Sequence, residues 1–357
     1  MASQVKDAAW LEWIAGLMGV GSRQTHSATL PPGQFHCLLD ELPLHLVPQR
    51  RLESQSWRQS HHSLFLNPEC SVLPAGGVPA ELERHRDLLK DFYLQGTIAW
   101  VRDPATAALQ PFWLGPRLEA VVASLHSGKL GAGKLGAGTP VSDAVPGDVL
   151  QLLAGAGILT TEDYAERRLA EWAEVVRKGA QQFRERGYIP LGNLIHPFNL
   201  AALRRYYRHA VRRGAICLGD VQSARRYAAH NESVACFYHH QIANAVSAVV
   251  GEAIKPSYVY LASYLSGADL KKHIDREQCE FSVTLCLDFS PEPELATSWP
   301  IRLDTPEGPV TVYQALGDGL VYRGTKVPHY RDVLAEGHTS TSIFFHYVPA
   351  DFSGSLE

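Results

Sequence analysis

The sequence predicts an α+β fold in which the helices come first and the strands come last. Between residues 164 and 254, apolar side chains recur at helical spacing in three segments. From Ser257 onward the period changes, and short runs rich in β-branched and aromatic residues follow within roughly 90 residues. Runs of this kind, separated by turn residues, predict an antiparallel double-sheet barrel with the helices packed on one face.

Length and composition argue against several classes of protein. The chain has 357 residues, 45% of them hydrophobic and 20% charged, which is typical of soluble globular proteins. Its formal net charge of -4 argues against a nucleic-acid partner, since sequence-independent binding needs a basic excess. No apolar stretch approaches the roughly 18 to 20 residues of a membrane span, and the N-terminus lacks the pattern of a secretory signal. The 6 cysteines form no CxxC pair, so we expect reduced thiols and a cytoplasmic protein.

Residues 1–145 predict a mostly helical or irregular N-terminal region of unknown role. Segments 81–94 and 111–125 have helical spacing, whereas the first 75 residues or so show no regular architecture. The sequence KLGAG occurs twice in tandem over residues 129–138. No Ser or Thr follows the second lysine, as the phosphate-binding Walker pattern requires, so we interpret the repeat as a flexible linker. A second domain is then expected over residues 146–357.

Three helices are expected before the strands. The first follows an N-cap candidate near Thr161 and ends at Gly187, a natural C-terminal stop. A short strand over residues 187–195 leads to a second helix over 198–213, and a third covers 239–254. We expect the arginines of the second helix to lie largely on its solvent face rather than to form an RNA-binding surface.

The strand-like runs bracket the residues that carry chemistry. The segment KKHIDRE falls after the first run, and His329 falls between the fifth and sixth. The runs themselves cover residues 257–265, 279–289, 299–305, 308–316, 319–324 and 340–348.

His273, Asp275 and His329 are the predicted metal ligands. On an extended strand, the side chains of His273 and Asp275 point to the same face. His329 comes 56 residues later, which gives the intervening strands room to wrap round a small barrel and return. Two imidazoles and one carboxylate on one face of an octahedral ion leave three positions open, an arrangement typical of non-haem iron(II) oxygenases. We therefore favour a metal centre over two solvated side chains.

Residues 185 to 350 resemble the iron(II)- and 2-oxoglutarate-dependent oxygenases, particularly the prolyl-4-hydroxylase-like branch. The resemblance rests on Tyr264, the HxD pair at 273–275, the strand over 317–322, His329 and the run that begins at His338. It implies a double-stranded β-helix (a jelly-roll, cupin-like barrel) that binds Fe(II), the cosubstrate 2-oxoglutarate and O2. The implied activity is a dioxygenase that hydroxylates an unactivated C–H bond, with succinate and CO2 as coproducts.

The resemblance also bears on reaction type and substrate. Related halogenases carry a small residue in place of the carboxylate, so Asp275 favours hydroxylation or desaturation. By analogy with prolyl hydroxylases, the expected substrate is an amino acid or a peptidyl residue, in natural-product biosynthesis. The N-terminal region is expected to serve either as a docking surface for a small-molecule or peptide substrate, or as a buttress and homodimer interface.

The cosubstrate anchor departs from the family pattern. The family places an arginine about nine or ten residues beyond the distal histidine, with a serine two residues later. Here His338 and Ser340 stand at that spacing, and a protonated histidine would bind the cosubstrate carboxylate in a pH-dependent way.

Other residues are candidates for the same anchor. Arg331 is one, and Lys326 and Arg323 are further ones; Tyr264 resembles the tyrosine that hydrogen-bonds this carboxylate in the family. Loss of the arginine leaves two alternatives open. One is a non-catalytic barrel that binds a ligand without turnover, and the other is an iron(II) oxygenase that does not use 2-oxoglutarate.

Overall fold

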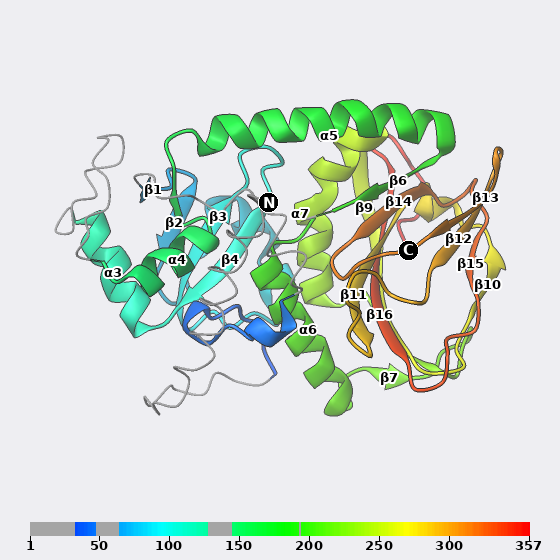
Figure 1. The fold of residues 1–357 in the computed structure, drawn as a ribbon, viewed down its shortest axis with the longest axis horizontal. Helices are drawn as coiled ribbons and strands as arrows, with labels where there is room; N and C mark the ends of the chain where they lie inside the picture. Colours follow the sequence, from blue (N-terminus) through cyan, green and yellow to red (C-terminus); the bar gives the residue numbers. More distant parts are fainter. Residues whose placement is uncertain (1–32, 48–63, 128–144, 193) are drawn as a thin grey trace, which may run out of the picture.

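The computed structural model describes residues 33–47, 64–127, 145–192 and 194–357, and combines helices with antiparallel sheets (Figure 1). The predicted α+β class is therefore confirmed at this level. The strands of these residues form four sheets, and every pairing between their named strands is antiparallel. The KLGAG repeats, which we predict to be a linker, lie outside the described residues.

The N-terminal portion contains a three-stranded sheet that the sequence did not reveal. Its strands are β2 (Cys70–Leu73), β3 (Thr97–Arg102) and β4 (Leu109–Leu114), in the order β2-β3-β4. All six residues of β4 are buried, so the strand lacks the alternation of apolar and polar residues that marks a half-exposed strand. The helix expected over 111–125 therefore begins only at Pro116, and the one expected over 81–94 is a 3-10 helix kinked at His85.

Short elements complete this portion. They are η1 (Leu39–Glu41), η2 (Leu44–Leu46), β1 (Phe65–Leu66), η3 (Ala80–Leu89), α3 (Pro116–His126), α4 (Gly147–Gly155) and β5 (Leu159–Thr160). Strand β5 pairs with β1, so the chain returns to the N-terminal portion after residue 145. The boundary at residues 145 and 146 stays a prediction.

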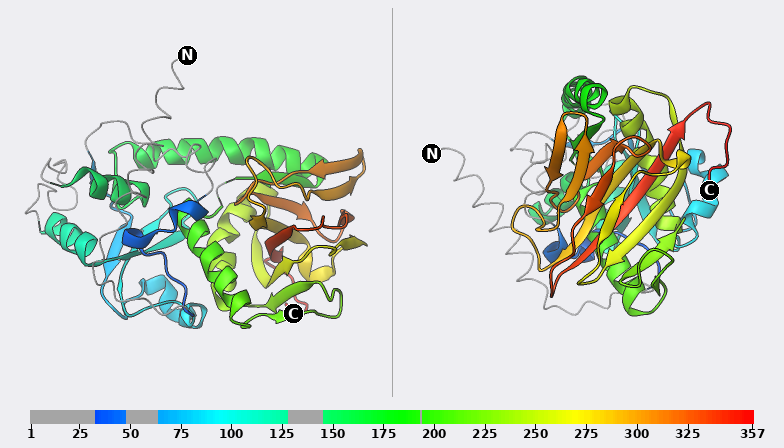
Figure 2. Two further views of the ribbon diagram at one scale, coloured as in Figure 1. Left: turned by 60° about the horizontal axis from the view of Figure 1, so that its bottom comes forward. Right: turned by 90° about the vertical axis from the view of Figure 1, so that its right-hand side faces the viewer.

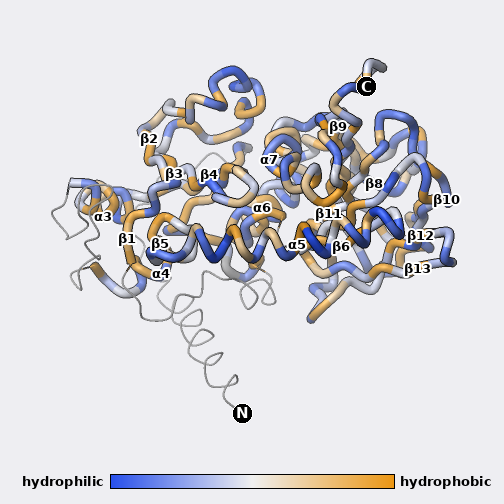
Figure 3. Tube along the Cα trace, turned by 90° about the horizontal axis from the view of Figure 1, so that it is seen from above, coloured by the Kyte–Doolittle hydropathy of each residue, from blue (hydrophilic) through white to orange (hydrophobic). Residues whose placement is uncertain are grey.

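Three long helices follow, as the sequence predicts: α5 (Tyr164–Arg186), α6 (Pro197–Arg212) and α7 (Ser233–Val250). Helix α5 ends where Gly187 adopts a left-handed φ of 74°, and it runs along one side of the whole molecule (Figure 1). Hydrophilic and hydrophobic residues alternate along it, as in an amphipathic helix (Figure 3). No helix of the described residues is long and apolar enough to cross a membrane.

Two larger sheets form the C-terminal portion (Figure 2, right). The first has the order β6-β14-β11-β16-β9-β8-β7, and the second has the order β10-β15-β12-β13. The strands of the first sheet are β6 (Tyr188–Leu191), β7 (Cys217–Leu218), β8 (Arg226–His230), β9 (Ile254–Tyr264), β11 (Phe281–Ser290), β14 (Gly319–Arg323) and β16 (Thr339–Pro349). Those of the second are β10 (Leu270–His273), β12 (Ile301–Thr305), β13 (Gly308–Val312) and β15 (His329–Arg331), and η4 (Glu277–Cys279) precedes β11. Each of the six predicted runs overlaps one of these strands, whereas β10 and β15 lie outside all six.

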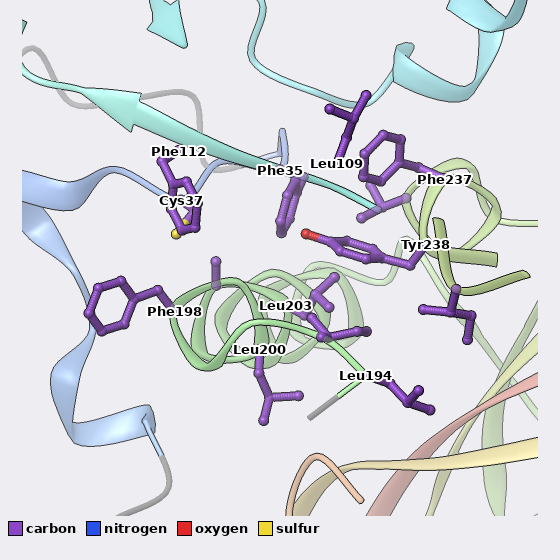
Figure 4. Close-up of a cluster of buried hydrophobic side chains, with 14 of the residues drawn as sticks. Phe35, Cys37, Leu109, Phe112, Leu194, Phe198, Leu200, Leu203, Phe237 and Tyr238 are labelled. Carbon is purple, nitrogen blue, oxygen red and sulfur yellow. The ribbon is translucent and has the colours of Figure 1, made fainter. Parts of the chain in front are cut away.

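The seven-stranded sheet separates two environments. On β16, Ile343, Phe345 and Tyr347 belong to the large core that also contains residues of the helices and of the N-terminal portion. Part of this core, around α6, is drawn in Figure 4. The alternate residues of β16 point the other way; Phe344, for example, packs with Trp299 in a separate cluster. The face of the sheet that carries Phe344 therefore lies outside the large core, and polar side chains can lie on it.

The second predicted helix differs from expectation at one residue. Arg204 on α6 is fully buried rather than solvated. Its guanidinium donates to Asp288 and Glu292 and to the backbone oxygen of Leu46. Helical spacing placed it with the solvent-facing arginines, but β11 and η2 pack against that side of the helix.

Candidate metal centre

One strand pair brings the two predicted histidine ligands together. His273, the last residue of β10, and His329, the first of β15, are Cα partners, and their ring centroids are 4.3 Å apart. Asp275 lies just beyond the end of β10, where its backbone N–H donates to the oxygen of Gly324 at 2.8 Å. The β10–β15 pair and the chain that follows β14 thus fix all three residues.

The three side chains converge. Asp275 Oδ1 lies 3.5 Å from His273 Nε2 and 3.5 Å from His329 Nε2. One ligand atom of each residue lies within 4.8 Å of the others. The opposite ring nitrogens are engaged elsewhere: His273 Nδ1 lies 2.7 Å from the oxygen of Lys271, and His329 Nδ1 lies 3.0 Å from that of Val327. With Nδ1 engaged in this way, each Nε2 points at the common point, where it donates to Asp275 when the ring is protonated and offers a lone pair to a metal when the ring is neutral.

The electrostatics favour a cation at this point. Burial opposes ionisation of Asp275, but hydrogen bonds from His273 and His329 outweigh it and hold the pKa of the carboxyl well below its usual range. The same hydrogen bond to Asp275 raises the pKa of His273. A carboxylate that stays ionised between two imidazoles is a ready ligand for a divalent metal.

The site is open on one side. The side chain of His329 is 3% exposed and that of Asp275 is 11% exposed, whereas that of His273 is 38% exposed. Two imidazole nitrogens and one carboxylate oxygen, with an open side, are the donors that iron(II) takes in non-haem oxygenases. The residues therefore fit that metal.

Arg331, one of the candidate anchors, is buried beside the metal site without an acidic partner. It lies on β15 two residues after His329 and is 5% exposed. The guanidinium donates to the oxygen of Trp299 and, at 3.1 Å, to Gln314 Oε1, and it stacks over the Trp299 ring at 4.8 Å. Its Nε has no hydrogen-bond partner in the part of the chain that the structure describes, and burial lowers the pKa of the guanidinium. Among the described residues, no carboxylate pairs with it.

Further polar groups surround Arg331. Ser342 on β16 is 1% exposed, and its Oγ has no hydrogen-bond partner among the described residues. Ser342 is the Cα partner of Cys286, a buried residue that lies near Arg331. Tyr264 is also buried, with its ring 5.1 Å from that of Trp299 and its hydroxyl accepting from Arg226 at 3.5 Å. The Nε of Arg331 and the hydroxyl of Ser342 both lack a hydrogen-bond partner among the described residues, and both lie near the thiol of Cys286.

The remaining anchor candidates lie elsewhere. Arg323 pairs with Glu280 and Glu252, and Lys326 also pairs with Glu280, so the charges of both are compensated. His338 precedes β16, where its ring lies 5.6 Å from that of Phe289. Its assignment as the anchor stays a prediction.

The position of Ser340 is also clear. It is the Cα partner of Phe289 and Tyr264, near the start of β16. A strand rises about 3.3 Å per residue, so the run from Ser340 to His346, which is beside the metal site, spans roughly 20 Å.

Sequence reasoning missed the residues that surround Asp275. Ser282 Oγ donates to Asp275 Oδ2 at 2.8 Å and lies 2.9 Å from His346 Nδ1. A Cβ at Gly324 would lie 2.4 Å from Asp275 Oδ2, so only glycine allows the backbone to approach this closely. Ser282 and His346 occupy ordinary positions in strand-like runs, and nothing in their spacing marked them.

Comparisons with known proteins complete the description of the site. No protein-family model matches the chain, and a search of curated proteins finds no match. Among solved structures, the chain is similar to the non-heme alpha ketoglutarate dependent epimerase SnoN from nogalamycin biosynthesis, at 12% identity and a TM-score of 0.42, over 50% of this chain and 84% of that one.

Two further solved structures are similar. A Pseudomonas putida prolyl-4-hydroxylase is 19% identical, with a TM-score of 0.39, over 48% of this chain and 98% of that one. An oxidoreductase of the 2OG-Fe(II) oxygenase family from Burkholderia pseudomallei is 14% identical, with a TM-score of 0.40, over 51% and 92% of the two chains. The candidate His-Asp-His iron site thus occurs in a chain that is similar to iron- and 2-oxoglutarate-dependent enzymes. Likenesses at this level identify no substrate.

Proposed function

We propose that the protein is an iron(II)- and 2-oxoglutarate-dependent oxygenase. The observation that carries the proposal is the cluster of His273, Asp275 and His329 together with a buried arginine beside it. This arginine, Arg331, lies on the same short strand as His329 and has no acidic partner among the described residues. A buried cation without a counter-charge is costly, so its retention beside a metal site points to an anionic ligand. The distal carboxylate of 2-oxoglutarate supplies that charge.

The topology supports the proposal. From β9 to β12 the chain alternates between the seven-stranded and the four-stranded sheet, and it alternates again from β13 to β16. We take this alternation to support a double-stranded β-helix, with β9, β16, β11 and β14 in one sheet and β10, β15, β12 and β13 in the other. The candidate ligands lie on the inward side of the smaller sheet or at its end.

Each residue of the proposed site would have its own role. His273, Asp275 and His329 would hold Fe(II), which when bound supplies O2 activation coupled to decarboxylation of 2-oxoglutarate to succinate and CO2. Arg331 binds the cosubstrate carboxylate through a charge-assisted pair, and Ser342 donates a further hydrogen bond. The oxygens of Trp299 and Gln314 orient the guanidinium.

Water exclusion and access follow from the burial of the same groups. The Arg331 end of the site is closed by buried aromatic side chains, which keeps water from screening the carboxylate pair. The exposed edge of His273 leaves the metal accessible to a substrate. Because Asp275 keeps the carboxylate ligand, hydroxylation of an unactivated C–H bond is the reaction we propose.

The substrate we propose is an amino acid or a peptidyl residue, in natural-product biosynthesis, by analogy with the prolyl-4-hydroxylase-like branch. We keep residues 1–145 as a docking or dimerisation region and 146–357 as the oxygenase domain. From the charge and composition of the chain, we also propose that the protein is cytoplasmic and that it binds neither nucleic acid nor a membrane.

An anaerobic titration with Fe(II) and 2-oxoglutarate, followed by visible absorption, tests the proposal. We expect a weak metal-to-ligand charge-transfer band in the wild type and none in His273→Ala. If iron binds without this band and without succinate formation, an iron oxygenase that does not use 2-oxoglutarate replaces the proposal. If folded protein binds no iron, a non-catalytic binding module replaces it.

A further inference from the structure

A chain of hydrogen bonds runs behind Asp275, on the side away from the two histidine ligands. Asp275 Oδ1 faces His273 and His329, whereas Oδ2 accepts from the hydroxyl of Ser282 at 2.8 Å. The Oγ of Ser282 lies 2.9 Å from Nδ1 of His346. The two carboxylate oxygens therefore have separate partners.

The direction of this chain is fixed by the chemistry of its members. The single O–H of Ser282 has two acceptors within reach, Asp275 Oδ2 at 2.8 Å and the backbone oxygen of Cys279 at 3.4 Å, and the closer, charged carboxylate is the stronger acceptor. The oxygen of Ser282 can then only accept from His346, which requires a proton on Nδ1 of that imidazole.

The chain is held rigidly from both ends. Ser282 is 1% exposed and His346 is 6% exposed, and the two residues are Cα partners on β11 and β16. The backbone oxygen of His346 accepts from Nε2 of His239, a buried residue on α7. Since these strands form the middle of the seven-stranded sheet, Ser282 has little freedom to leave Asp275.

A second metal site is the competing interpretation of this cluster. Asp275, Cys279 and His346 also have ligand atoms within 4.8 Å of one another. However, Ser282 Oγ is already bonded to both Asp275 and His346, and Cys279 Sγ lies 3.0 Å from the hydroxyl of Tyr258. Hydrogen bonding accounts for the cluster better than a second ion.

We propose that Ser282 and His346 are positioning residues for the metal centre: they hold Asp275 so that Oδ1 points between the two imidazoles. This inference rests on the proposed metal-binding function. It adds that the affinity for metal depends on a serine hydroxyl and an imidazole that do not touch the metal. Outer hydrogen bonds of this kind typically change metal affinity by about 10-fold to 100-fold.

The test is an anaerobic titration of the metal-free full chain with Co(II) alone, followed by calorimetry and by the visible spectrum of the ion. We expect one ion per chain in the wild type, and about 10-fold to 100-fold weaker binding in Ser282→Ala. Ser282→Thr keeps the hydroxyl and should restore the affinity. The matched control is Thr284→Val, which removes a buried hydroxyl at the next inward position of β11 and should bind Co(II) as the wild type does.

A second pair of variants tests the far end of the chain, and stands alone if Ser282→Ala does not fold. His346→Asn can keep an N–H near Ser282 and should retain most of the affinity, whereas His346→Leu should lose it. Equal affinity in wild type, Ser282→Ala and His346→Leu would overturn the inference while leaving the metal centre intact. Two ions per chain, with one lost in Cys279→Ser, would overturn it in favour of the second site. A wild type that binds no Co(II) would instead remove the proposed function itself.

Discussion

His329 and Arg331 share one face of β15, with the half-buried Tyr330 between them on the other. Alternate residues of a strand point the same way, so the three-residue strand carries both a candidate metal ligand and the buried cation beside it. The distance between the proposed metal and the proposed cosubstrate anchor is therefore set by strand geometry rather than by a loop. A difference of one residue in the register of β15 would remove both groups from the site.

Replacing Arg331 by Met should separate cosubstrate binding from stability. Removal of this buried cation should leave the ligand-free protein about as stable as the wild type in urea unfolding, because relief of its desolvation cost offsets the lost hydrogen bonds to Trp299 and Gln314. Affinity for 2-oxoglutarate should fall by roughly 10-fold to 100-fold or more, because hydrogen bonds to charged groups are worth about 1.5 to 3 kcal/mol.

Two controls accompany that variant. Arg302→Met removes an arginine that pairs with Asp332 on the surface of the same sheet, and should change neither quantity. His338→Ala should leave 2-oxoglutarate affinity unchanged. A loss of affinity in His338→Ala, with none in Arg331→Met, would return the anchor to the position that the family spacing suggests.

Gly324→Ala should weaken metal binding without any change of ligand. The added Cβ would lie 2.4 Å from Asp275 Oδ2 and 2.6 Å from Ser282 Oγ, so the carboxylate has to move. We expect at least a 10-fold loss of Co(II) affinity in calorimetry. Gly147→Ala is the control, because its Cβ would meet nothing within 4 Å. Unchanged affinity in Gly324→Ala would show that Asp275 tolerates displacement.

Arg204→Ala should destabilise the fold strongly. The change leaves Asp288, whose side chain is 12% exposed, with one cation fewer and removes the link from α6 to the oxygen of Leu46. Breaking a buried ion pair typically costs about 3 to 5 kcal/mol, measurable as a lower urea midpoint. The exposed Arg212, on the same helix, provides the control, and Arg212→Ala should stay within about 0.5 kcal/mol of the wild type.

The stability of the protein should fall as the pH falls from about 6.5 toward 4, in part through His196. This residue caps α6, with Nδ1 accepting from the N–H of Phe198 and Nε2 donating to the oxygen of Gly155. Burial lowers its pKa from 6.5 to about 4. Between these values the unfolded chain binds more protons than the folded one, so the free energy of unfolding rises with pH in this window and is fully developed above it.

The variant His196→Asn tests this contribution. Asparagine can keep the cap of α6 but does not titrate. We expect lower stability than the wild type at pH 7.5, and a smaller loss between pH 7.5 and 5 in urea unfolding. An equal pH dependence in the two proteins would assign the effect to the other buried histidines.

The sequence by itself determined the elements whose signals are local. The period of apolar residues located α5, and Gly187 marked its end because a left-handed residue stops a helix there. The change to short β-branched runs located β9, β11, β12, β13, β14 and β16, but not β10 or β15. The one-residue spacing of His273 and Asp275 depends only on the short chain between them, and it indicated a site before any fold was known.

Only the tertiary structure decided the relations between distant segments. The pairing of β10 with β15 places His329 beside His273, and no local pattern encodes that register. The sequence alone does not distinguish Arg323 from Arg331. In the packed structure Arg323 pairs with two glutamates, whereas Arg331 pairs with no acidic residue among those described. The hydrogen bond from Ser282 to Asp275 likewise exists because the fold brings β11 beside the segment that carries His273 and Asp275. Charge compensation and burial are properties of the packed chain, so they could not be predicted from spacing alone.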